Sequence, residues 1–286
     1  MITGLFPGQG LDARHVDNAL SSEHPYIADA SEVLGTDLPR SIARIAGRSP
    51  RSSIPTDLAQ VAIFVAGIVA FERERTTTPF ERLLGHSLGE YTALVAARAM
   101  SFHDALRVVT VRARAMKRAA QASHGGMAAA AGIEPATARE ICERRGVFIA
   151  NDNSPSQLVL AGPERELALA ASDVGAAGGR TVLLPVDGAF HTPAMAPAAS
   201  ALQAALAHVD VRSPRIEVIS NVTAAPYRSP GEIRKLLVRQ LTETVRFRES
   251  LVEAVARGSS EFVDLGPGRV VARLADAVTT SEVAHV

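Results

Sequence analysis

The stretch Gly85-His86-Ser87-Leu88-Gly89-Glu90 decides the fold of this 286-residue chain. Two apolar residues, Leu83-Leu84, precede it, and a helix-compatible stretch at residues 91–99 follows it. A Gly-x-Ser-x-Gly spacing between a strand and a helix is typical of a nucleophile elbow, a sharp turn that exposes a serine hydroxyl. The helix N-terminus behind that serine would favour a developing oxyanion. A chance pattern in a loop is the alternative, and the strand-to-helix context favours an elbow with Ser87 as nucleophile.

The composition excludes several classes of protein. Hydrophobic residues make up 47% of the chain and charged residues 21%, as in ordinary α/β enzymes. The formal net charge is zero, so we expect no nucleic-acid partner. No apolar run is long enough for a transmembrane helix, and the first residues lack the pattern of a signal peptide, so we expect no membrane association. Cys142 is the single cysteine, which rules out an internal disulfide and fits a reducing cytoplasm.

The middle of the chain predicts a small inserted unit. The expected strands are residues 127–131, 148–151, 157–161 and 181–185, and the expected helices are residues 135–145 and 164–177. Their order, β-α-β-β-α-β, is the ferredoxin-like pattern. We therefore expect an α/β fold in which a large α/β-hydrolase-like domain with a parallel sheet, residues 1–123 and 188–286, contains a ferredoxin-like subdomain at residues 124–187.

Two further side-chain types are candidates for the site around Ser87. His191 directly follows the expected insert, and a cleft between two domains is a usual ligand site, so it is the best histidine for a base. A surface loop histidine is the alternative. A helix expected to begin at Ser101 carries Arg107, Arg112, Arg114 and Arg118. One arginine that faces the cleft would clamp a carboxylate, while most belong on a solvated face. The His, Cys, Asp and Glu residues show no metal-ligand spacing.

A turn at Pro7-Gly8-Gln9-Gly10 follows the first expected strand, residues 2–6. Glycines on both sides leave the backbone N–H of Gln9 exposed, which suits an anion or oxyanion site. A plain strand-ending turn is the alternative. His86 adjoins Ser87, but neighbouring side chains at an elbow diverge, so we expect a structural hydrogen bond from His86.

Six short motifs occur together in this chain. They are Pro7-Gly8-Gln9-Gly10, Gly85-His86-Ser87-Leu88-Gly89-Glu90, Asn153-Ser154-Pro155, Gly188-Ala189-Phe190-His191, Ser220-Asn221-Val222-Thr223 and Gly266-Pro267-Gly268. In this combination and order, the chain resembles the malonyl-CoA:acyl-carrier-protein transacylases, including the acyltransferase domains of polyketide synthases. The resemblance extends from Phe6 to about Leu274.

The resemblance implies a two-step acyl transfer. Ser87 would attack the thioester of malonyl-CoA with His191 as general base, and the acyl group would then pass to the phosphopantetheine thiol of an acyl carrier protein. Backbone N–H groups of Gln9 and Leu88 would form the oxyanion hole, and Arg112 would clamp the malonyl carboxylate. We expect malonyl-CoA as substrate, a carrier protein as partner and no permanently bound cofactor.

The resemblance also assigns supporting roles. A backbone carbonyl, that of Arg246, would orient His191 without a third acid. In Ala189-Phe190-His191 the phenylalanine would fill the space of an α-methyl group, which would favour malonyl over methylmalonyl by about 1–3 kcal/mol. Further supporting residues are His86, Gln60 and Asn153. A basic stretch would help to dock an acidic carrier, with a solvated helix face as the alternative; it contains Arg228, Arg234, Lys235, Arg239, Arg246 and Arg248.

Several functions stay open at this point. We expect polyketide rather than fatty-acid biosynthesis. The alternatives are a transferase for another acyl unit between carrier proteins, a serine thioesterase or hydrolase with water as acceptor, and a non-catalytic docking module. Arg112 argues against a hydrolase, because ester hydrolysis has no general use for a carboxylate clamp. Ser87, His191 and Arg112 together argue against a docking module.

Overall fold

A four-stranded parallel sheet in the order β7-β2-β1-β9 carries the elbow. The computed structural model describes residues 1–21, 23–48 and 53–283. Strand β2 ends at Gly85, directly before the elbow, and its neighbour β1 ends at Phe6, directly before the turn that contains Gln9. The carboxyl ends of these parallel strands therefore bring the two turns together. The strands are β1 (Ile2–Phe6), β2 (Arg82–Gly85), β7 (Glu217–Ile219) and β9 (Glu261–Asp264).

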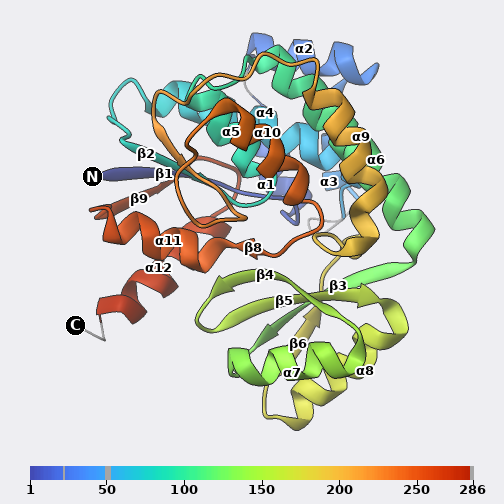
Figure 1. Cartoon of the computed structure of the whole chain (residues 1–286). Coiled ribbons are helices and arrows are strands. Elements are labelled where there is room, and N and C mark those ends of the chain that lie inside the picture. Colours follow the sequence, from blue (N-terminus) through green and yellow to red (C-terminus); the bar gives the residue numbers. More distant parts are fainter. Residues whose placement is uncertain (22, 49–52, 284–286) are drawn as a thin grey trace.

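Helices cover both faces of this sheet (Figure 1). Successive strand residues point to opposite faces, so Phe6 and Leu83 join one core cluster while Leu5 and Leu84 join another. The first cluster packs under α4 (Thr56–Glu74), α5 (Gly89–Ala96) and α6 (Phe102–Ser123), and the second under α11 (Phe247–Ala256) and α12 (Val270–Val283). This arrangement confirms the expected α/β fold with a parallel sheet.

Helix α4 is buried over most of its length, as its apolar sequence predicts. Residues 59–68 are all buried, because the sheet lies on one side of the helix and neighbouring helices cover the others. No helix in the part of the chain that the structure describes is long and apolar enough to cross a membrane.

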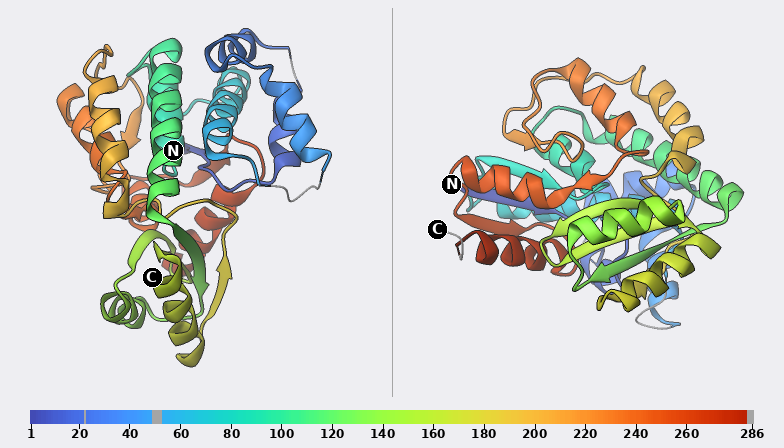
Figure 2. Two further views of the ribbon diagram at one scale, coloured as in Figure 1. Left: turned by 90° about the vertical axis from the view of Figure 1, so that its right-hand side faces the viewer. Right: turned by 60° about the horizontal axis from the view of Figure 1, so that its bottom comes forward.

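A second sheet lies below the first in Figure 1, and its helices α7 and α8 cover the face turned away from the rest of the molecule (Figures 1 and 2). Its strand order is β6-β3-β5-β4-β8. The first four strands and two helices follow the expected β-α-β-β-α-β order. They are β3 (Gly125–Ala131), α7 (Pro135–Arg145), β4 (Phe148–Ser154), β5 (Gln157–Pro163), α8 (Glu164–Ala176) and β6 (Arg180–Leu183).

Strand β8 (Val245–Arg246) has no counterpart in the sequence prediction. It pairs in parallel with β4, with Asn151 opposite Val245, so the second sheet includes chain from outside residues 124–187. Two residues give no periodic signal, and such a strand forms only because β4 offers it an edge. The division into domains at residues 124 and 187 stays a prediction.

The remaining helices complete the upper part of the molecule in Figure 1. Helix α9 is absent from the sequence prediction; it packs on α6 and buries Ala198, Leu202 and Leu206, which are spaced four residues apart. Its many alanines provide only a weak amphipathic pattern. The other elements are α1 (Ala13–Ala19), α2 (Pro25–Leu34), α3 (Leu38–Ala46), the 3₁₀ turn η1 (Pro193–Met195), α9 (Ala196–Leu206) and α10 (Pro230–Arg239).

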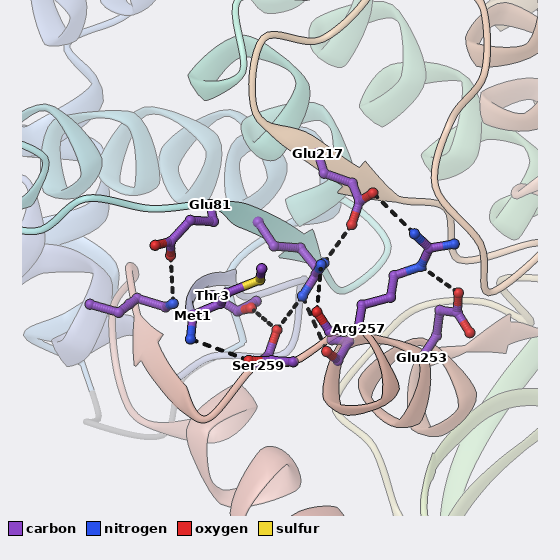
Figure 3. Close-up of polar contacts among 11 residues, drawn as sticks. Met1, Thr3, Glu81, Glu217, Glu253, Arg257 and Ser259 are labelled. Atoms are coloured by element: carbon purple, nitrogen blue, oxygen red, sulfur yellow. Dashed lines mark hydrogen bonds and ion pairs between the residues drawn. The ribbon is translucent and has the colours of Figure 1, made fainter.

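The amino ends of the parallel strands are joined by a polar network around Arg82, which is 5% exposed. Its Nε donates to Glu217 Oε1 at 2.6 Å, and its Nη1 donates to the Ala254 carbonyl at 3.1 Å and to Ser259 Oγ. Thr3 shares a hydrogen bond of 2.7 Å with the same Ser259 hydroxyl, as Figure 3 shows. Arg82, the first residue of β2, thus bonds to Glu217, the first residue of β7, and to Ser259 just before β9, at the end of the sheet opposite the elbow.

Candidate active site

Ser87 occupies the turn between β2 and α5 with φ of 52°, in the left-handed region that non-glycine residues rarely adopt. The turn is so tight that a Cβ on Gly85 would lie 1.9 Å from the Gly89 carbonyl carbon, and one on Gly89 would lie 2.2 Å from the Phe6 carbonyl oxygen. Both glycines are therefore sterically required. This is the geometry of a nucleophile elbow.

The structure brings His191 to Ser87, although 104 residues separate them. His191 Nε2 lies 2.8 Å from Ser87 Oγ. On the other side of the ring, Nδ1 lies 2.7 Å from the main-chain carbonyl of Gln240. That carbonyl can only accept, so Nδ1 carries the proton and Nε2 is free to accept the serine proton.

The residue that orients the histidine is Gln240, and the expectation of Arg246 is wrong. The Arg246 carbonyl accepts a hydrogen bond from Ser250 Oγ at 2.8 Å in the first turn of α11. Its N–H donates to the Asn221 carbonyl at 2.9 Å, and its side chain pairs with Glu249. Arg246 is thus committed to strand β8 and to the start of α11. Any residue type can supply a main-chain carbonyl, so the sequence could not identify the residue that orients His191.

His191 is neutral in this setting. Burial, together with the nearby positive charge of Arg112, lowers the pKa of its imidazole to about 3. A neutral imidazole with a free Nε2 lone pair can accept a proton from the serine at any physiological pH.

Among the four arginines on α6, Arg112 faces the site. It is 1% exposed, whereas Arg107, Arg114 and Arg118 are exposed. Its Nη2 donates to Ser87 Oγ at 3.0 Å and to Gln240 Oε1 at 3.1 Å, and its Nη1 donates to Gln60 Oε1 at 2.6 Å.

The contacts of Arg112 leave its charge without a direct counter-ion. All its acceptors are neutral, its Nε has no hydrogen-bond partner, and no ion pair to it occurs among the described residues. Its guanidinium lies 5.3 Å from the centre of the Tyr91 ring, a cation–π contact. A buried cation beside the nucleophile, with an unused donor, favours binding of an anionic group.

Two backbone N–H groups are available next to Ser87. Neither Gln9 nor Leu88 donates a hydrogen bond from its backbone nitrogen to any other described residue. The turn that carries Gln9 lies against the elbow, because a Cβ on Gly8 would be 2.7 Å from the His86 carbonyl oxygen. Both groups therefore suit an oxyanion hole.

A cavity of about 270 Å³ opens over Ser87, His191 and Arg112. Phe190 lines it together with Met116 and Met127. Ala189 is not among its lining residues. It packs instead against Gly125, where an added Cβ would lie 2.8 Å from the Ala189 methyl group.

His86 makes the structural hydrogen bond expected of it. Its Nε2 lies 2.8 Å from Asn153 Oδ1, and Asn153 Nδ2 donates to Gln157 Oε1 at 2.9 Å. Burial lowers the pKa of His86, so this ring is neutral as well. The chain of contacts connects the elbow to β4 and β5 of the second sheet.

Sequence reasoning missed most of the residues that hold the elbow. Asn221 accepts from the Ser87 N–H and donates to the Gly85 carbonyl, both at 2.7 Å. Gln240 donates to the Ser87 carbonyl at 3.0 Å. Asn221 and Glu90 stood within quoted motifs but carried no assigned role, while Gln240 belongs to no motif.

The basic stretch expected to dock a carrier is largely paired within the molecule. The guanidinium groups of Arg228, Arg239, Arg246 and Arg248 form ion pairs with Glu232, Glu243, Glu249 and Asp152. Arg234 donates to the carbonyls of Leu206 and Val209. These pairs favour the alternative of a solvated helix face. Among the described residues, no group of three or more His, Cys, Asp or Glu side chains could hold a metal ion.

Comparisons with known proteins agree over almost the whole chain. Residues 5–285 match a family model described as acyl transferase domain. The polyketide biosynthesis protein ThaF of Burkholderia thailandensis is 37% identical over 278 residues, which are 94% of this chain and only 23% of that protein. The malonyl CoA-acyl carrier protein transacylase of Bacillus subtilis is 35% identical over 290 residues, which are 97% of this chain and 90% of that protein. A solved complex of a type II polyketide synthase acyl carrier protein with its malonyl-transacylase has a TM-score of 0.87 at 29% identity, covering 98% of this chain and 93% of that chain.

Proposed function

The chain belongs to the acyl transferase family, and on that premise we propose that it moves a malonyl group from CoA to the phosphopantetheine thiol of an acyl carrier protein through a Ser87 acyl-enzyme. One observation carries the choice of a malonyl group. Arg112 is a buried cation that forms no direct ion pair within the part of the chain that the structure describes, and it donates to Ser87 Oγ at 3.0 Å. The free carboxylate of a malonyl thioester supplies the missing anion, and acetyl has none to offer.

The first half-reaction begins at the Ser87 hydroxyl. Its proton passes to His191 Nε2, 2.8 Å away, while Oγ forms a bond to the thioester carbonyl carbon. The oxyanion that develops is stabilised by the N–H groups of Gln9 and Leu88. When the C–S bond breaks, the CoA sulfur receives the proton from His191. The product is a malonyl ester on Ser87.

The second half-reaction repeats these steps with the carrier thiol. The phosphopantetheine thiol gives its proton to His191, and its sulfur attacks the ester carbonyl. Breaking the C–O bond returns the proton to Ser87 Oγ and releases the malonyl thioester of the carrier. The similarity to a malonyl CoA-acyl carrier protein transacylase and to a transacylase in complex with its carrier supports this acceptor.

Binding of the carboxylate also prepares the base. The positive charge of Arg112 is one cause of the low pKa of His191. When a malonyl carboxylate neutralises that charge, the pKa of His191 rises and the imidazolium formed during attack is stabilised. The correct acyl group thereby strengthens the base that activates the nucleophile.

The biosynthetic route is the finer part of the proposal. We assign polyketide biosynthesis, supported by the 37% identity to a polyketide biosynthesis protein and by the structural likeness to a transacylase bound to a polyketide synthase carrier. Phe190 in the cavity wall supports malonyl over bulkier extender units, because a large ring there would leave less room for an α-methyl group.

The test is intact-mass measurement of the protein after incubation with malonyl-CoA, followed by addition of a phosphopantetheinylated carrier. We expect one malonyl group on the wild type, none on Ser87→Ala, and its disappearance onto the carrier. Ser156→Ala, a change at an exposed serine, is the matched control and should load like the wild type. Absence of malonyl on Ser87 would reject the proposal, and release of free malonate in place of carrier loading would make the protein a hydrolase.

A further inference from the structure

Gln240 connects the base, the arginine and the nucleophile turn. Its carbonyl accepts from His191 Nδ1, its Oε1 accepts from Arg112 Nη2 at 3.1 Å, and its Nε2 donates to the Ser87 carbonyl at 3.0 Å. The residue is fully buried. A guanidinium only donates and a carbonyl only accepts, so the Gln240 amide satisfies both neighbours in one orientation and neither when inverted.

The carboxylate of Glu90 contacts the nitrogen of that amide. It is fully buried in the first turn of α5, and its Oε2 accepts from Gln240 Nε2 at 2.5 Å. Its Oε1 accepts from the Asn221 N–H at 3.3 Å and from the Tyr227 hydroxyl. All three neighbours donate, which fits the acceptor-only, ionised carboxylate. Glu90 forms no ion pair with another described residue.

We propose that Glu90 is a positioning residue that acts through the Gln240 amide to hold Arg112 in the orientation that receives the carboxylate of the acyl group. The inference rests on the proposed function. An acceptor behind Gln240 Nε2 keeps the amide oxygen turned toward Arg112. A donor at the same place would repel Nε2 and favour the inverted amide, which would present an NH₂ group to the guanidinium and displace it.

The chemistry of the position supports this role over a purely structural one. Burial raises the pKa of Glu90 to about 7, even though hydrogen bonds from Tyr227, Gln240 and Asn221 lower it. An ionised carboxylate buried without an adjacent cation is unfavourable for folding. A glutamine of the same shape would avoid that penalty, but it cannot present acceptors to Tyr227 and Gln240 at once. The site therefore requires a side chain whose two oxygens both accept hydrogen bonds.

The surrounding groups leave Glu90 as the one that titrates near neutral pH. Tyr91 on α5 and Tyr227 before α10 have pKa values raised well above their ordinary range by burial. His191 has a pKa of about 3. Arg112 on α6 stays protonated, as guanidinium groups do in proteins. The malonyl carboxylate is ionised throughout, since ordinary carboxyl pKa values lie near 4.

The sign of the pH effect follows from these groups. Above pH 7 Glu90 is ionised and holds the Gln240 amide in place. Below it, one carboxyl oxygen carries a proton, so Glu90 can no longer accept hydrogen bonds at both oxygens and its hold on that amide weakens. The preference for malonyl over acetyl should therefore rise with pH, with a midpoint near 7.

The experiment is competitive loading of Ser87 with equal malonyl-CoA and acetyl-CoA from pH 5.5 to 8.5, read by intact mass. In Glu90→Gln the malonyl-to-acetyl ratio at high pH should fall by about tenfold or more, as expected when a hydrogen bond to a charged group is lost. The remaining ratio should not change with pH. Its urea unfolding midpoint at pH 8 should equal or exceed that of the wild type.

Tyr227→Phe is the second variant, because it keeps the Glu90 carboxylate and its bond to Gln240. It removes a donor that lowers the pKa of Glu90, so the midpoint of the ratio should move to higher pH while the preference at the alkaline limit persists. A pH-independent ratio in the wild type overturns the inference. So does a Glu90→Gln variant with the wild-type ratio, or one in which both loadings fall equally along with stability. Failure of the wild type to load malonyl would instead reject the proposed function.

Discussion

Two buried arginines at opposite ends of the parallel sheet differ in what surrounds them. Arg82, at the amino end, donates to the Glu217 carboxylate, to Ser259 and to main-chain carbonyls. Arg112, beside the carboxyl end, donates only to neutral oxygens among the described residues, none of which accepts from its Nε. For Arg82 the protein itself supplies an anionic partner, and the pair stabilises the fold. For Arg112 no described residue supplies a direct anionic partner, as expected of a residue that binds an anionic ligand.

Buried charges that stabilise the fold and buried charges that bind a ligand differ in whether the protein supplies their counter-ion. Removing one member of a satisfied buried pair leaves the other uncompensated and destabilises the protein. Removing a cation that has no direct counter-ion leaves no buried anion uncompensated, although neutral acceptors lose a donor. A variant of Arg82 should therefore reduce stability more than malonyl loading, and a variant of Arg112 should reduce malonyl loading more than stability.

The largest effect is expected from the base at the carboxyl end. His191→Ala should slow malonyl loading of Ser87 by about 10²–10⁴-fold, the usual contribution of a positioned general base. Single-turnover quench-flow with intact-mass detection measures it. Loading at nearly the wild-type rate would remove His191 from the mechanism.

Arg112→Ala sharpens the comparison directly. Malonyl transfer should lose about 3–5 kcal/mol of transition-state stabilisation, because the substrate carboxylate is left without its partner. Weak acetyl loading should hold steady or improve, and the unfolding free energy should fall less than in Arg82→Ala, because only neutral acceptors lose a donor. Arg112→Lys should restore malonyl loading only in part, since an ammonium cannot make a planar two-pronged contact. An unchanged malonyl-to-acetyl ratio would show that Arg112, like Arg82, does not bind the substrate carboxylate.

Arg82→Ala should have the opposite signature. We expect a loss of about 3 kcal/mol in unfolding free energy, the low end for a broken buried pair. The low end applies because Glu217 is 30% exposed and also lies 3.4 Å from Arg257. Equilibrium urea unfolding measures this loss, while the malonyl-to-acetyl ratio should match the wild type.

Arg107→Ala is the matched control for Arg82→Ala, because its pair with Asp104 is at the surface. It should change the unfolding free energy by less than about 1 kcal/mol. If the two variants were equally stable, the amino-end network would have no special role in stability.

The smallest effect is expected at Ser259, which lies between Arg82 and Thr3 (Figure 3). Ser259→Ala removes one acceptor and should lower the unfolding free energy by about 1 kcal/mol. Loading should be unaffected. A loading defect in this variant would mean that the two ends of the sheet are coupled, contrary to the comparison.

Local sterics made much of the fold predictable from the sequence. Gly85 and Gly89 mark the elbow because no side chain fits there, and the change of pattern after residue 124 marks the strands and helices of the second sheet. Strand β8 and helix α9 were not predicted. A two-residue strand and a run of alanines show little periodicity of apolar residues.

The amino-acid sequence was enough to identify the nucleophile turn, the order of the elements in the second sheet and the residue types available for chemistry. It did so because a tight turn and an apolar period depend on neighbours along the chain. Only the tertiary structure decided which arginine of α6 meets Ser87, and that Gln240 rather than Arg246 orients His191. Every residue carries the same main-chain carbonyl, and side chains on one helix differ only in what packs against them. Contacts of this kind are set by how distant segments pack together.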